Sequence, residues 1–129
     1  MKTLLLDTHA LLWWFTNPEA LAADVRAAVD DDANRVLVSP VSAYELAFKH
    51  RLGKLEQADL LLAAFEWRLA GQGFDKLPIT DRHALVAGRL DLRHRDPFDR
   101  LLIAQALVEN VEIVSNEELF DSFGVRRFW

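Results

Sequence analysis

The chain has 129 residues, a formal net charge of −5 and no cysteine. Its length fits one domain with a sizeable core, and its 51% hydrophobic and 27% charged residues are ordinary for a globular protein. The lack of cysteine excludes disulfides, thiolate catalysis and cysteine zinc sites. The net negative charge argues against a protein that coats nucleic acid in general. It remains compatible with an enzyme that binds nucleic acid through metal ions and a local group of basic residues.

The sequence begins Met1-Lys2-Thr3 and continues directly into a short apolar run. This pattern does not fit a signal peptide, and no apolar run reaches the length needed to span a membrane. We therefore expect no membrane contact and a cytoplasmic location.

Short apolar runs alternate with helical patterns along the chain. The apolar runs predict buried strands at 4–6, 36–38 and 111–114, a weaker strand at 74–77 and an edge strand at 125–129. Helical patterns lie between them at 8–14, 21–29, 41–49, 58–70, 81–90 and 97–107. This alternation is typical of a doubly wound parallel sheet. We predict one α/β domain over residues 1–129, with three α/β/α layers and a short, mostly parallel sheet.

Asp7 directly follows the first predicted strand. Open α/β sheets place their ligand crevices at the carboxyl ends of such strands, so Asp7 is a candidate functional acid. The alternative is that its side chain only caps the helix that starts at Thr8.

Glu45 lies on or beside the apolar stripe of the helix predicted at 41–49. A glutamate in that place needs a partner or a metal ion, because burying a bare charge is costly. A solvent-exposed pair with Lys49, four residues on, is the alternative. The helix ends in a basic run that includes Arg51. This run either complements the helix dipole or forms part of a phosphate-binding rim.

A basic connection at 92–95 leads to two further acids. Asp96 precedes Pro97 as an N-cap, and Asp99 stands three residues past that cap. Both acids fit helix capping. Asp99, however, stands at the start of a very apolar helix, and we expect it at the buried N-terminal end of that helix. Glu117 follows the strand at 111–114 as Asp7 follows the first strand.

If the strands at 4–6 and 111–114 are neighbours, four carboxylates converge at one end of the sheet. They belong to Asp7, Glu45, Asp99 and Glu117. Without counter-charge these groups would raise one another's pKa, and divalent cations remove that cost. Sites made only of oxygen ligands suit Mg²⁺ or Mn²⁺ better than zinc. Such ions polarise phosphodiesters and activate water.

Four stretches together resemble PIN-domain proteins, and more narrowly the VapC-type ribonuclease toxins of bacterial toxin–antitoxin pairs. They are DTHALLWW at 7–14, SAYELA at 42–47, HRDPFDRLLIAQA at 94–106 and VSNEELF at 114–120. The resemblance covers essentially the whole chain in the right order. It implies a Mg²⁺-dependent endoribonuclease, with Mn²⁺ able to substitute, that cleaves structured RNA and is held inactive by a cognate antitoxin. We also expect a homodimer.

By position, the metal-binding acids of this family fall on Asp7, Glu45 and Asp99. The fourth acid of the family is usually aspartate, and Glu117 stands in its place here. The extra methylene group either shifts the second metal ion or is harmless. Weaker candidates for RNA contacts are the basic residues near these acids, namely Arg51, Arg95 and Arg100.

Two other functions stay open at this point. A phosphoryl-transfer protein with Asp7 as acceptor should carry a second aspartate two residues later, where this chain has His9, and no glycine-rich phosphate loop is present. A catalytically weak or inactive PIN-fold module that binds RNA or protein would keep the same fold. The intact acids Asp7, Glu45 and Asp99 weigh against it.

Overall fold

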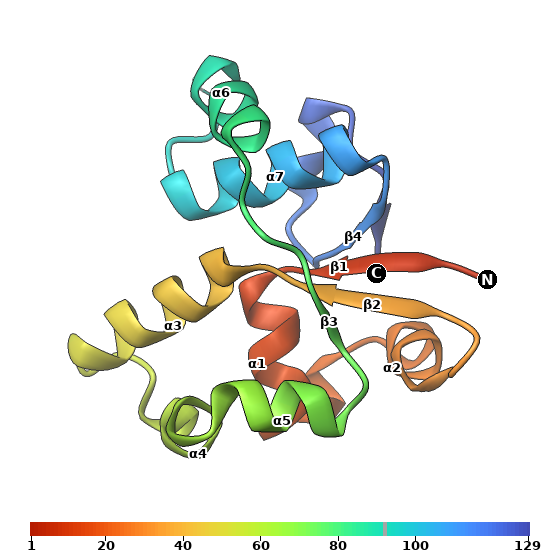
Figure 1. Ribbon diagram of the computed structural model, residues 1–129, viewed down its shortest axis with the longest axis vertical. Coiled ribbons are helices and arrows are strands. Elements are labelled where there is room, and N and C mark those ends of the chain that lie inside the picture. Colours follow the sequence, from red (N-terminus) through yellow and green to blue (C-terminus); the bar gives the residue numbers. More distant parts are fainter. Residues whose placement is uncertain (92) are drawn as a thin grey trace.

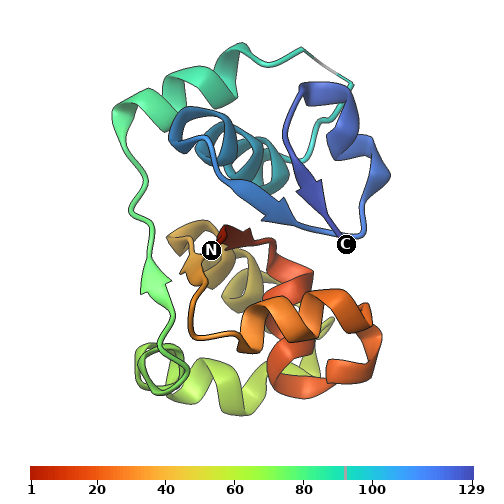
Figure 2. The same cartoon turned by 90° about the vertical axis from the view of Figure 1, so that its right-hand side faces the viewer.

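The computed structural model describes residues 1–91 and 93–129, and these form an α/β fold around a parallel sheet (Figures 1 and 2). Residue 92, in the predicted basic connection, lies outside the described part. The strand order is β3-β2-β1-β4-β5. The strands are β1 Thr3–Leu6, β2 Arg35–Val38, β3 Asp75–Lys76, β4 Glu112–Val114 and β5 Arg127–Phe128. The predicted fold class is confirmed, although the outer strands are shorter than expected.

Strand β1 lies at the centre of the sheet. It pairs in parallel with β2, with Leu5 opposite Leu37, and with β4, with Leu5 opposite Ile113. The first and fourth strands are therefore neighbours, as the site prediction required. Leu4, Leu5 and Leu6 are at most 1% exposed, which explains a leucine run without polar alternation.

Helices cover both faces of the sheet. They are α1 Thr8–Thr16, α2 Ala23–Asp30, α3 Pro40–Arg51, α4 Asp59–Ala63, α5 Phe65–Gly71, α6 Asp81–Arg89 and α7 Pro97–Glu109. Short 3₁₀ helices are η1 Pro18–Ala20, η2 Glu56–Ala58 and η3 Glu118–Phe123. Leu4 and Leu6 pack into a core with α1, α2 and α5, whereas Leu5 packs into a core with α7 and η3. Figure 1 shows α6 and α7 on one side of the sheet and α1, α2 and α5 on the other.

The single helix expected at 58–70 is wrong, because Ala64 breaks it into α4 and α5. Ala64 has φ −145° and ψ 45°, which no helical residue adopts. The break redirects the chain so that Leu61 and Leu69 both enter the same core. Propensity favoured a continuous helix here, and tertiary packing overrode it.

No helix among the described residues is both long enough and apolar enough to cross a membrane.

Candidate metal centre

Asp7 both caps α1 and contributes a buried carboxylate to the carboxyl end of the sheet. Its Oδ1 accepts a hydrogen bond from the Ala10 amide at 2.8 Å, and its own amide donates to the Val114 carbonyl at 3.0 Å. The residue is only 4% exposed. Burial raises the pKa of Asp7 to about 6, against the opposing effect of hydrogen bonds from Ser115 and Ala10. Capping and a functional role therefore do not exclude each other at Asp7.

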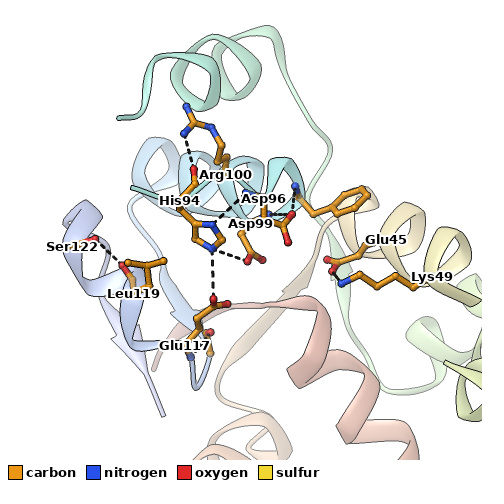
Figure 3. A network of polar contacts seen from close by, with 11 residues as sticks. Glu45, Lys49, His94, Asp96, Asp99, Arg100, Glu117, Leu119 and Ser122 are labelled. Atoms are coloured by element: carbon orange, nitrogen blue, oxygen red, sulfur yellow. Dashed lines mark hydrogen bonds and ion pairs between the residues drawn. The ribbon is translucent and has the colours of Figure 1, made fainter. Parts of the chain in front are cut away.

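Glu45 is buried and paired at the same time. It is 2% exposed on α3, and its Oε2 accepts a hydrogen bond from Lys49 Nζ (Figure 3). Its Oε1 is buried with no hydrogen-bond partner among the described residues. A buried contact of 3.1 Å between the hydroxyls of Thr8 and Ser42 ties α1 to α3 near the start of both helices. This contact fixes the helix of Glu45 against the helix that follows Asp7.

The two acids at the start of α7 have different tasks. Asp96 caps the helix, because its Oδ1 accepts hydrogen bonds from the amides of Phe98 at 2.9 Å and Asp99 at 3.4 Å. The Asp99 side chain instead enters the carboxylate cluster and is 15% exposed. Burial raises the pKa of Asp99 to about 8, and nearby carboxylate charges add to the shift. These charges belong to Asp96, Glu117, Glu45 and Asp7.

Glu117 lies at the outer rim of the cluster, immediately before η3. Its side chain is 43% exposed, and its carboxylate does not cap the short helix. Its amide donates to Ser115 Oγ at 3.0 Å, which holds the turn after β4. Glu117 is therefore the most accessible of the four acids that the sequence singled out.

His94 belongs to the basic connection and to the family-like stretch at 94–106, but the sequence did not predict it as a site residue. It is 8% exposed, and its Nε2 lies 2.8 Å from Asp99 Oδ2 and 3.6 Å from Glu117 Oε1 (Figure 3). Neither contact has hydrogen-bond alignment, so Nε2 has no hydrogen-bond partner among the described residues. The ring contacts the aromatic rings of Phe120 and Phe123. His94 lies outside any helical or strand pattern in the sequence, so its burial could not be predicted.

The tautomer of His94 follows from its other nitrogen. The Asp96 amide donates to Nδ1 at 3.4 Å, and an amide N–H can only donate. Nδ1 is therefore unprotonated in the neutral ring, and Nε2 carries the proton. Ligand atoms of His94, Asp99 and Glu117 lie within 4.8 Å of one another, as in a metal site. In this tautomer Nε2 carries a proton and cannot bind a metal ion, and it makes no hydrogen bond to either carboxylate.

The three arginines proposed for RNA contacts differ in their surroundings. Arg51 and Arg95 are exposed. The guanidinium of Arg100 donates to main-chain carbonyl oxygens of Ala87, Gly88, Leu90, Asp91 and His94. These bonds hold the connection between α6 and α7, so the donors of Arg100 are engaged within the protein. A sequence pattern does not reveal this role, because the carbonyls belong to the end of α6 and to the segment that follows it.

The cluster fits a divalent cation bound by oxygen. The charges of Asp7, Glu45, Asp96 and Glu117 all act on Asp99, and ligand atoms of Asp99 and Glu117 lie within 4.8 Å of one another. The raised pKa values of Asp7 and Asp99 show that ionising these buried carboxyl groups is unfavourable. Glu45 Oε1 has no hydrogen-bond partner among the described residues and is available as a ligand atom. An all-oxygen set of this kind matches the preferences of Mg²⁺ and Mn²⁺.

Comparisons with known proteins agree with this fold. Ribonuclease VapC22 of Mycobacterium tuberculosis is 29% identical over 119 residues, covering 91% of this chain and 88% of the relative. The DNA-bound VapBC structure from Salmonella typhimurium matches 99% of this chain and 98% of its own, with a TM-score of 0.72 and 17% identity. VapBC2 from Rickettsia felis, bound to a DNA fragment from its promoter, covers 98% of both chains with a TM-score of 0.70 and 14% identity.

The two structural matches show a shared fold at low sequence identity. The family assignment comes from the sequence itself, because the family model described as PIN domain matches residues 4–125. This range includes Asp7, Glu45, Asp99 and Glu117. The chain belongs to the PIN-domain family.

Proposed function

We propose that the chain is a Mg²⁺-dependent endoribonuclease and the toxin of a toxin–antitoxin pair. The observation that carries the proposal is the buried carboxylate cluster at the carboxyl ends of β1 and β4, which lacks enough positive charge to balance it. The similarity to ribonuclease VapC22 supports RNA as the substrate. The similarity to VapBC assemblies supports a cognate antitoxin as partner.

In this proposal Asp7, Glu45 and Asp99 hold the metal ion from three elements that the sheet fixes in place. Glu117 completes the set from the exposed rim. A bound Mg²⁺ would polarise the scissile phosphodiester, activate the attacking water and stabilise the leaving oxygen. His94 lies beside Asp99 and Glu117, and its ring packs against Phe120.

The remaining alternative is a PIN-fold module that binds RNA or protein without cleaving it. The two functions separate in one experiment with the purified chain and a labelled RNA stem-loop. The proposed nuclease cuts the RNA with Mg²⁺ and stops when EDTA is added, whereas the module binds without cutting. Mapping the ends of cleaved cellular RNA then identifies the target. Co-expression with the product of the neighbouring gene should suppress cleavage if that product is the antitoxin.

We expect Glu117→Gln to reduce cleavage less than Asp7→Asn does. Glu117 is 43% exposed at the side chain, so water can take over part of its role, whereas Asp7 is buried. Glu117→Asp should be tolerated or improve Mg²⁺ affinity, because a shorter arm suits octahedral geometry. Cleavage rates and calorimetric Mg²⁺ affinities of the three variants measure this. Equal and complete loss in Glu117→Gln and Asp7→Asn would make Glu117 a full ligand.

We further expect Arg51→Ala and Arg95→Ala to raise KM for RNA and to flatten its salt dependence. Each lost phosphate contact reduces the number of counterions released on binding. RNA binding at two salt concentrations, with Ca²⁺ in place of Mg²⁺ to prevent turnover, measures the slope. Arg35→Ala is a matched control, because Arg35 is exposed at the opposite end of the sheet and pairs with Asp75. If the salt dependence of RNA affinity is unchanged in the Arg51/Arg95 double variant, these two arginines do not contact the RNA phosphates.

A further inference from the structure

Lys49 places its ammonium group inside the carboxylate cluster. Its Nζ donates to Glu45 Oε2 from one turn further along α3, and the side chain is 28% exposed (Figure 3). Burial acts to lower the pKa of Lys49. The hydrogen bond to Glu45 and the negative charges of Glu45, Asp96 and Asp99 outweigh burial and raise the pKa overall. The ammonium group is thus close to acids of α7 as well as to Glu45 of its own helix.

The other lysine and arginine ion pairs of the described residues lie outside this cluster. They join Lys2 to Glu112, Arg35 to Asp75, Lys76 to Glu66, Arg93 to Asp91 and Arg127 to Asp121. Lys49 thus supplies the charge compensation at the Glu45 side of the cluster in the metal-free protein.

Glu45 is the point at which the ammonium and a metal ion meet. Its Oε2 is engaged by Lys49, and its Oε1 is buried without a hydrogen-bond partner among the described residues. A divalent cation bound to the carboxylate would lie within a few bond lengths of the ammonium, with little water between them. Like charges at that separation repel strongly in a partly buried site. The two cations therefore compete for the negative charge of this carboxylate.

We propose that Lys49 is an internal competitor of the metal ion and, once displaced, a phosphate-binding residue. Metal binding to Glu45 releases the ammonium, and the long flexible stem carries it to the exposed mouth of the site. There it meets the negatively charged backbone of the RNA next to the bound metal. The competition depends only on the metal centre, whereas the phosphate contact rests on the proposed ribonuclease function.

Lys49→Met should have opposite effects on two ligands. Methionine keeps the length and apolar stem but removes the charge. Mg²⁺ affinity measured by calorimetry should rise by about tenfold or more, because the repelling charge is gone. Affinity for a labelled RNA stem-loop in Ca²⁺ should fall several-fold. A residue needed only for folding would weaken both, so the opposite signs are specific to competition.

Two further variants control for side effects. Lys2→Met removes a lysine from another lysine–glutamate pair, 3.0 Å long and next to β1 on the amino side of the sheet. It should leave both affinities unchanged. Lys49→Arg keeps the positive charge and should bind Mg²⁺ as the wild type does. An unchanged or weaker Mg²⁺ affinity in Lys49→Met would overturn the competition, and unchanged RNA affinity would overturn the phosphate contact.

A measurement on the wild type makes the test independent of how Lys49→Met folds. The ¹³Cε NMR signal of Lys49 should shift on titration with Mg²⁺ and narrow to the line width of an exposed lysine. A signal that stays in place while Mg²⁺ binds contradicts displacement. Failure of the wild type to bind Mg²⁺ at all would instead remove the metal centre, and the competition with it.

Discussion

Asp7→Asn and Asp99→Asn should each lower RNA cleavage by about a hundredfold or more while the fold survives. Each substitution removes the charge of a metal ligand but keeps the size and shape of the side chain. In Asp7→Asn the amide side chain would still offer an oxygen to the Ala10 amide, so the start of α1 is preserved. Asp99 does not cap α7, because Asp96 does, so its replacement leaves the helix start intact.

The measurement is a cleavage time course at saturating Mg²⁺, together with calorimetric Mg²⁺ binding and circular dichroism of each variant. Asp24→Asn is the matched control, since Asp24 is an exposed acid in the first turn of α2. It should behave as the wild type. Cleavage that persists in either purified site variant would refute the assignment of these acids. A large fall in the melting temperature of Asp7→Asn would show that capping is the main role of Asp7.

The position of these acids could be predicted because it depends on strand order and on local rules. Buried leucines identified β1, and helix alternation identified parallel strands, whose carboxyl ends meet at one edge of the sheet. Asp7 follows β1 directly, so pairing of β1 with β4 was enough to bring it toward the turn that carries Glu117. Glu45 was predicted from helical periodicity, which placed it on the apolar side of α3.

The roles of His94, Arg100 and Lys49 could not be predicted, because they depend on which atoms meet across the fold. His94 lies in a loop, which has no periodicity to interpret, and Arg100 binds carbonyls at the end of α6 and in the segment that follows. For Glu45 and Lys49 the sequence offered burial and pairing as alternatives, and the structure combines them. The break at Ala64 belongs to the same class, since core packing and not propensity decides it.

The metal-free protein should lose stability as the pH rises from 5 to 8. Burial raises the pKa of Asp7 from its usual value of 3.8 to about 6, and that of Asp99 to about 8. The unfolded chain releases these protons near pH 4, whereas the folded chain holds them longer. The stabilisation is therefore complete below pH 4 and is lost as the pH passes 6 and then 8. One pKa unit corresponds to about 1.4 kcal/mol, so the loss between pH 5 and 8 is about 5 kcal/mol, most of it from Asp99.

Thermal unfolding in EDTA at several pH values measures this loss, which corresponds to a fall of about 20 °C in melting temperature. Exposed Asp91 and Asp121, whose pKa values are lowered by Arg93 and Arg127, do not contribute, because they are already charged throughout this range.

The Asp99→Asn variant shows how much of the pH dependence of stability comes from the carboxylate cluster and how much from other groups that titrate between pH 5 and 8. It removes the most strongly shifted acid and reduces the charge on its neighbours, so the variant should melt at a higher temperature than the wild type at pH 8. The two proteins should converge near pH 5, where Asp99 is protonated and resembles asparagine. Saturating Mg²⁺ should flatten the profile of the wild type, since the ion stabilises the charged carboxylates that the metal-free fold resists. A wild-type profile that Asp99→Asn leaves unchanged would mean that the cluster carries no electrostatic strain, and the reason to expect a cation there would be gone.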